Sequence, residues 1–177
     1  ILACYGFNET WDYKGENGIN RFKTDLEIFI KELQSKNYNG LTAPKIILYS
    51  PLACEGNDVP DTKERNRLIS LYSNTMQSVA LSHGIPFIDL YNASLKLYQQ
   101  DNDTSYTING IHLTAEGYVK LAPSILPDSL FATLPENAPL EKIQGEVLEK
   151  NDTFFDWYRT VNSFYICLLY TSDAAEE

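Results

Sequence analysis

Two short polar segments carry the side chains best suited to chemistry. Gly6-Phe7-Asn8-Glu9 follows a short apolar run, and Asn109-Gly110-Ile111-His112-Leu113 comes much later in the chain. A glycine just past a strand lets the chain turn sharply, which makes the Asn8 amide a hydrogen-bond donor above the strand end. Such a donor can stabilise an oxyanion, and the imidazole of His112 can deprotonate a nucleophile. Together the two segments predict an acyl-transfer site.

The apolar pattern predicts the elements that position these segments. Short apolar runs at Ile1–Tyr5, Lys45–Ser50 and Pro86–Leu90 predict three strands, the first of them buried on both faces. Amphipathic stretches at Asn17–Lys36 and Asp61–His83 predict the helices between them. This alternation is the βαβ pattern of a parallel sheet, so we predict an α/β fold.

Both polar segments fall where a parallel sheet binds its ligands, at the carboxyl ends of the strands. The first directly follows the first predicted strand. The second lies beyond the third strand and a short predicted helix, Tyr91–Gln100. We therefore expect the side chains of Asn8 and His112 to lie within about 10 Å of each other, the span of one small acyl group.

Composition excludes several classes of function. The 177 residues carry a net charge of −10, which argues against nucleic acid and anionic membrane surfaces as partners. Hydrophobic residues make up 44% of the chain, enough for a packed core, and no apolar run is long enough to span a membrane. The three cysteines and two histidines match no metal-ligand or disulfide pattern, so we expect no metal and no cofactor.

In this order, the two polar segments resemble the SGNH or GDSL-like hydrolases. Gly6–Glu9 is similar to the family's Gly-x-Asn-Asp block, and Asn109–His112 is similar to its Asp-x-x-His block. The resemblance covers Ile1–Phe131 and, more loosely, Leu140–Ile166. It implies a three-layer α/β/α sandwich on a parallel sheet and a serine esterase. It also implies that Asn8 contributes to the oxyanion hole and that His112 is the general base.

Three departures from the family pattern qualify this resemblance. No Gly-Asp-Ser occurs in the 177 residues, so we expect the nucleophilic serine to be missing from this chain and the domain to be truncated at its N-terminus. Asn109 stands where the family has Asp. Its carbonyl can orient His112, but it cannot stabilise the imidazolium by charge. Glu9 replaces the closing Asp of the first block, which is a mild change.

The chain is predicted to have three parts. Residues 1–131 form the C-terminal part of an SGNH-hydrolase-like domain, and residues 132–166 form a helical and aromatic extension that includes a helix at Leu140–Lys150. Residues 167–177 closely resemble a translated sequencing adapter, and we expect them to make few contacts. Thr107–Gly117 resembles a bacterial subgroup of the family whose members are often fused to further domains.

The resemblance implies a small ester as the substrate, with an O-acetyl group on a carbohydrate as one candidate. The sequence leaves the localisation of the parent protein open, with secretion or the periplasm as candidates. Gly6, Glu9 and Trp11 are candidate substrate-binding residues. Trp11 and Tyr13 either stack on a sugar ring or pack against the protein.

Two other functions stay open. The first is a catalytically inactive module of the same fold that binds a carbohydrate or a partner domain, which Asn109 favours. The second is an interaction or linker domain in which Leu140–Ile166 docks on a neighbour.

Three further residues are interpreted as having no role in catalysis or binding. Glu55 and Asp58 follow the second predicted strand in a polar loop, where we expect both carboxylates to be solvated. Cys4 lies inside the first predicted strand, and we expect a small buried apolar side chain there.

Overall fold

The structure is a computed structural model of the chain, and it describes residues 1–12, 14–56, 61–100, 104–125 and 139–158. The chain divides into two compact units, residues 1–131 and 132–177, which we describe separately. The assignment of residues 1–131, 132–166 and 167–177 to a domain, an extension and a tail stays a prediction.

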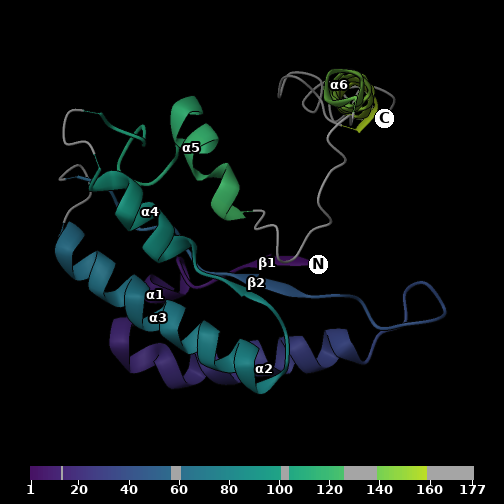
Figure 1. The fold of residues 1–177 in the computed structure, drawn as a ribbon. Helices are drawn as coiled ribbons and strands as arrows, with labels where there is room; N and C mark the ends of the chain where they lie inside the picture. Colours follow the sequence, from purple (N-terminus) through teal and green to yellow (C-terminus); the bar gives the residue numbers. More distant parts are fainter. Residues whose placement is uncertain (13, 57–60, 101–103, 126–138, 159–177) are drawn as a thin grey trace, which may run out of the picture. The chain divides into compact units, whose positions relative to one another are not determined.

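A parallel sheet lies at the centre of the first unit (Figure 1). Its strands are β1 (Leu2–Cys4), β2 (Ile47–Tyr49) and β3 (Phe87–Ile88), in the order β1-β2-β3. Leu2 pairs with Ile47, and Leu48 pairs with Phe87. The predicted α/β fold with a parallel sheet is confirmed.

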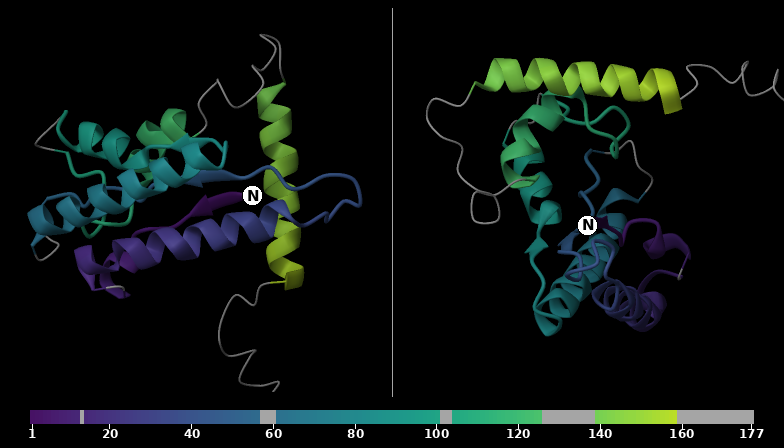
Figure 2. Two further views of the ribbon diagram at one scale, coloured as in Figure 1. Left: turned by 90° about the horizontal axis from the view of Figure 1, so that it is seen from below. Right: turned by 90° about the vertical axis from the view of Figure 1, so that its right-hand side faces the viewer.

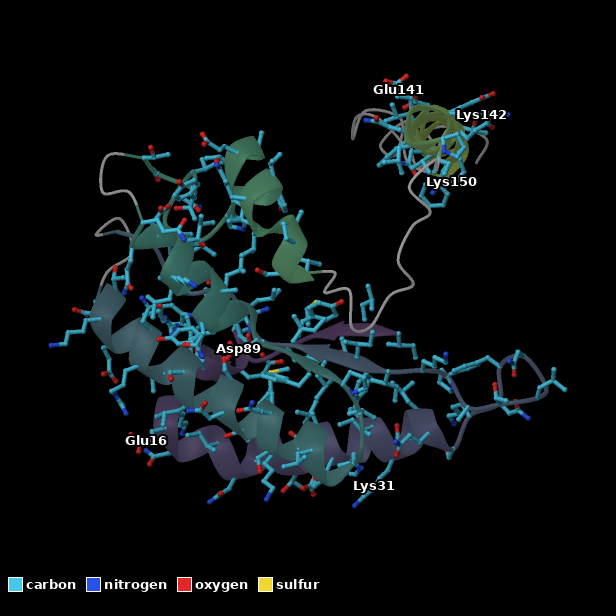
Figure 3. All side chains as sticks on the ribbon, viewed as in Figure 1. Glu16, Lys31, Asp89, Glu141, Lys142 and Lys150 are labelled. Carbon is cyan, nitrogen blue, oxygen red and sulfur yellow. The ribbon has the colours of Figure 1, made fainter. Side chains whose placement is uncertain are left out.

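Helices connect the strands and extend beyond them. Between β1 and β2 come α1 (Glu9–Asp12), the 3-10 helix η1 (Gly15–Gly18) and α2 (Ile19–Gln34). Helix α3 (Thr62–Ser82) joins β2 to β3, and α4 (Leu90–Tyr98) and α5 (Ala115–Ile125) follow β3. Asp89, labelled in Figure 3, accepts a hydrogen bond from the backbone N–H of Asn92 and so caps α4 at the point where β3 ends.

The helices cover opposite faces of the sheet, with α2 and α3 on one side and α4 and α5 on the other (Figures 1 and 2). Alternate strand residues explain this layering, because successive side chains of a strand point to opposite faces. Ala3 and Leu48 pack with Phe22, Leu26, Tyr72 and Met76 of α2 and α3. Tyr49 and Ile88 point the other way and pack with Leu90 and Ile125. The three-layer sandwich is therefore present.

The first strand is not buried on both faces as expected. Ala3 is buried, but Leu2 is 59% exposed and Cys4 is also exposed. Leu2 and Cys4 face away from the core formed with α2 and α3. The core cluster on that second face draws its buried strand residues from β2 and β3. The interpretation of Cys4 as a buried residue was wrong for the same reason, because Cys4 faces away from the core that α2 and α3 form on the other side of β1.

The second unit contains helix α6 (Leu140–Tyr158), which runs further than the predicted Leu140–Lys150. The apolar side chains that the structure describes between residues 140 and 155 are exposed, among them Ile143, Val147 and Phe154. Residues 167–177 lie outside the described residues, so the adapter interpretation stays a prediction. No helix in the described part of the chain is long and apolar enough to cross a membrane.

Candidate active site

The turn that carries Asn8 connects β1 to α1 and is held by bonds within itself. Gly6 has a φ of +98°, a conformation that favours glycine, and its N–H donates to Oε2 of Glu9 at 2.8 Å. The hydroxyl of Thr10 donates to the carbonyl of Phe7 at 2.6 Å, and the N–H of Trp11 donates to the carbonyl of Asn8 at 2.9 Å. This turn leaves the Asn8 side chain exposed just beyond β1.

Asn109 orients His112 through its side-chain oxygen. Oδ1 of Asn109 accepts the backbone N–H groups of His112 at 3.0 Å and of Ile111 at 3.3 Å, and it lies 3.0 Å from Nδ1 of His112. Two backbone donors can only face an acceptor, so the amide oxygen and not its NH2 group must point this way. Nδ1 therefore carries the proton of the neutral ring, and Nε2 keeps its lone pair. This is the tautomer that a general base needs.

Glu55 holds the segment that precedes His112. Its carboxylate accepts hydrogen bonds from the N–H groups of Tyr106 at 2.9 Å and Thr107 at 2.7 Å. It also accepts the hydroxyl groups of Thr107 at 2.6 Å and Ser105 at 3.0 Å. The backbone N–H of Glu55 in turn donates to the carbonyl of Gly110 at 2.8 Å.

The expectation of a solvated carboxylate at Glu55 was therefore wrong. The donors come from a segment far along the chain, which no local pattern around Glu55 could reveal. Asp58 lies outside the described residues, as does Tyr13.

Both polar segments pack on one hydrophobic cluster. Its buried members include Ala53, Cys54 and Ile69, and Phe7 and Ile111 pack against them. Phe7 precedes Asn8 and Ile111 precedes His112, so the two segments border the same part of the core. The approach of the Asn8 and His112 side chains to within about 10 Å stays a prediction.

Neither Cys54 nor Ser50 replaces the expected serine nucleophile. Burial raises the pKa of the Cys54 thiol, an effect that the charge of Arg65 only partly opposes, so the thiol stays protonated and unreactive near neutral pH. The Ser50 hydroxyl is buried, and it accepts the N–H of Tyr91 at 2.8 Å. Both residues are structural.

Two other observations bear on ligands. Among the described residues, no group of three His, Cys, Asp or Glu side chains is placed to hold a metal ion.

Trp11 is 59% exposed, and the guanidinium carbon of Arg65 lies 3.1 Å from the centre of its ring. No sequence motif singles out Arg65. Its place four residues before Ile69, on the buried face of α3, is the signal that could have found it.

The first unit thus has a parallel sheet with helices on both faces, and Asn8 lies directly beyond the carboxyl end of β1. Residues 1–120 match the GDSL-like lipase/acylhydrolase family, and the chain belongs to this family. No protein among the curated proteins matches it.

Solved structures share the fold at low sequence identity. An acetylxylan esterase from Geobacillus stearothermophilus is 17% identical and superimposes with a TM-score of 0.57, over 77% of this chain and 62% of that one. An alpha/beta hydrolase enzyme from the metagenome of Lake Arreo, Spain, is 20% identical with a TM-score of 0.52, over 71% and 57%. The chain thus spans about three fifths of the length of these structures.

Proposed function

We propose that this chain supplies the oxyanion donor and the general base of a serine esterase. One observation carries the proposal: the hydrogen bond from Nδ1 of His112 to Oδ1 of Asn109, which leaves Nε2 as a base. Membership of a family named for lipases and acylhydrolases supports the same chemistry. The serine is proposed to lie in a Gly-Asp-Ser block outside these 177 residues.

The proposed reaction follows from these roles. Nε2 of His112 takes the proton from the serine hydroxyl as its oxygen attacks the ester carbonyl. The Asn8 amide donates a hydrogen bond to the resulting oxyanion. His112 then protonates the leaving alcohol, and a water molecule releases the acyl group by the same steps. Asn109 holds the ring throughout, but as a neutral group it stabilises the imidazolium less than an aspartate would.

The proposed substrate is a small acyl ester, and we favour an O-acetyl group on a carbohydrate. The acetylxylan esterase that shares this fold supports this choice of substrate class. The exposed ring of Trp11, one helical turn beyond Asn8, offers a surface suited to a sugar.

Replacement of the base tests the proposal. A longer form of the protein, with a Gly-Asp-Ser block ahead of Ile1, should hydrolyse 4-nitrophenyl acetate and acetylated xylo-oligosaccharides. His112→Ala should lower its kcat by about 10⁴-fold or more, because the serine then lacks its base. His83→Ala is the matched control, since His83 lies at the far end of α3, and it should leave kcat unchanged.

The 177-residue chain alone should show no turnover in this assay. If the chain alone hydrolyses the ester, and if both a serine-directed inhibitor and His112→Ala abolish that activity, the nucleophile lies within the chain. The proposed place of the serine would then be wrong.

A second candidate is a binding module with an inactive site. The neutral Asn109 at the position of the family's acid favours it. The same assay separates the two functions. A binding module would bind the carbohydrate but would show no His112-dependent hydrolysis, even in the longer form of the protein.

A further inference from the structure

A cavity of about 340 Å³ lies between α1, η1 and the start of α3. Trp11, Asp61, Glu64 and Arg65 contribute its polar and aromatic lining. Strand β1 leads into α1, and α3 begins beyond β2, so the cavity lies toward the carboxyl edge of the sheet (Figure 1). Parallel sheets bind their ligands along this edge.

The side chain of Arg65 is buried but incompletely paired. It is 5% exposed, its Nη1 donates to the hydroxyl of Thr10 at 2.8 Å, and its guanidinium stacks on Trp11. Nη2 is buried and has no hydrogen-bond partner among the described residues. A buried donor on a charged group is costly to leave unpaired, so the cavity is suited to a ligand that brings an acceptor.

The charges around Arg65 favour a neutral acceptor over an anion. Asp61 and Glu64 line the cavity together with Arg65, and Arg67 binds Glu64 at 2.8 Å, so the carboxylate of Asp61 is the cavity's other negative charge. An anionic ligand would meet this carboxylate and a chain of net charge −10. A hydroxyl group suits both neighbours, because it can accept from an arginine and donate to an aspartate.

We propose that this cavity is a subsite for one sugar ring of the ester substrate. Nη2 of Arg65 donates to a ring hydroxyl, Asp61 accepts from a second hydroxyl, and the part of the Trp11 indole that Arg65 leaves exposed borders the sugar. The substrate class rests on the proposed function.

Hydrogen bonds join the subsite to the turn that carries Asn8. Thr10 accepts from Arg65 and donates to the carbonyl of Phe7, and the N–H of Trp11 donates to the carbonyl of Asn8. A sugar bound beside Arg65 therefore lies one helical turn from the residue proposed to stabilise the oxyanion.

Tryptophan fluorescence of the full chain tests the subsite with xylotriose as the probe. Trp157→Phe removes the second of the two tryptophans, so the emission reports Trp11 alone. Xylotriose should change this emission in a saturable way. Asp61→Asn and Arg65→Gln should each weaken binding at least tenfold, and Arg21→Gln, an equal charge change on an exposed α2 side chain, should alter it less than twofold.

Two variants need a second measurement. Trp11→Ala lacks the fluorescent side chain, and Arg65→Gln removes a buried side chain and can prevent folding. Isothermal titration of Trp11→Ala should show binding at least tenfold weaker than in the unaltered chain. Circular dichroism identifies an Arg65→Gln protein that fails to fold, in which case Asp61→Asn and Trp11→Ala decide the matter, since both side chains line the cavity surface.

Three results would overturn the subsite: no saturable binding of xylotriose, undiminished binding in both Trp11→Ala and Asp61→Asn, or tighter binding of glucuronate than of xylotriose. These outcomes are separate from the esterase proposal. His112-dependent hydrolysis of 4-nitrophenyl acetate without xylotriose binding would remove the subsite alone. Xylotriose binding that depends on Trp11 and Asp61, without any hydrolysis, would support the subsite and remove the esterase.

Discussion

The segments around Asn8 and His112 are fixed in different ways. Around Asn8 the bonds are local: Glu9 accepts from Gly6, and Thr10 donates to Phe7, in each case three residues apart. Around His112 the bonds are of both kinds: the Asn109 contact and the backbone bond from the Ile108 N–H to the His112 carbonyl at 2.7 Å are local. The stretch leading to it is bound to the Glu55 carboxylate, which lies in the connection between β2 and α3.

This difference implies different sensitivities to change. A turn closed by its own residues re-forms when they are present, so substitutions around Glu55 should leave the Asn8 turn intact. Its distant support is the bond from Arg65 to Thr10, which does not involve Glu55. The His112 segment is correctly placed only when the connection after β2 and the start of α5 are both in position. We therefore expect the geometry of the general base to be more easily lost than that of the oxyanion donor.

The largest effect is expected from Gly117→Ala, at the start of α5. A Cβ atom on Gly117 would collide with the backbone oxygen of Tyr106, and backbone cannot move aside as a flexible side chain can. The first turn of α5 would have to separate from the His112 segment, at a cost of about 3 kcal/mol or more in unfolding free energy. Thermal and urea unfolding measure this loss.

Gly145→Ala provides the matched control, because a Cβ atom at Gly145 in α6 meets no atom within 4 Å. That change should be neutral or stabilise its helix by up to about 1 kcal/mol. Equal stabilities for the Gly117 and Gly145 variants would show that α5 and the His112 segment are not tightly packed.

The sequence predicted what depends on neighbouring residues and missed what depends on distant ones. Helical periodicity located α2 and α3, because Phe22, Leu26 and Ile30 repeat every four residues on the buried face. The strand ends located Asn8. Glu55 and Arg65 could not be assigned this way, because their partners, Thr107 and Thr10, lie about fifty residues away along the chain. Exposure of Leu2 likewise depends on which helices cover β1, which the strand's own residues do not encode.

Glu55→Ala should have the next largest effect. It removes the acceptor of two backbone N–H groups and two hydroxyl groups, and we expect a loss of about 2 kcal/mol in unfolding free energy, because water can reach part of this half-buried site. Amide hydrogen exchange should accelerate at Tyr106 and Thr107 and stay unchanged at Gly6. In Glu55→Gln the amide oxygen can replace the oxygen that binds Thr107 and Ser105, so about half the loss should remain. If amide exchange in Glu55→Ala accelerates at Gly6 as well as at Tyr106 and Thr107, the two segments are not held independently.

Glu9→Ala should have the smallest effect, about 1 kcal/mol or less, because it removes a single hydrogen bond from a half-exposed carboxylate. Exchange should accelerate at Gly6 and remain slow at Tyr106, the reverse of the pattern for Glu55→Ala. Glu9→Gln keeps an oxygen acceptor and should lie between Glu9→Ala and the unaltered chain. Thr10 would still tie the turn to Phe7 and to Arg65, so Asn8 should keep its place even when Glu9 is lost. A loss as large as that of Glu55→Ala would mean that Glu9 supports more than its own turn, and the distinction between a locally held donor and a remotely held base would fail.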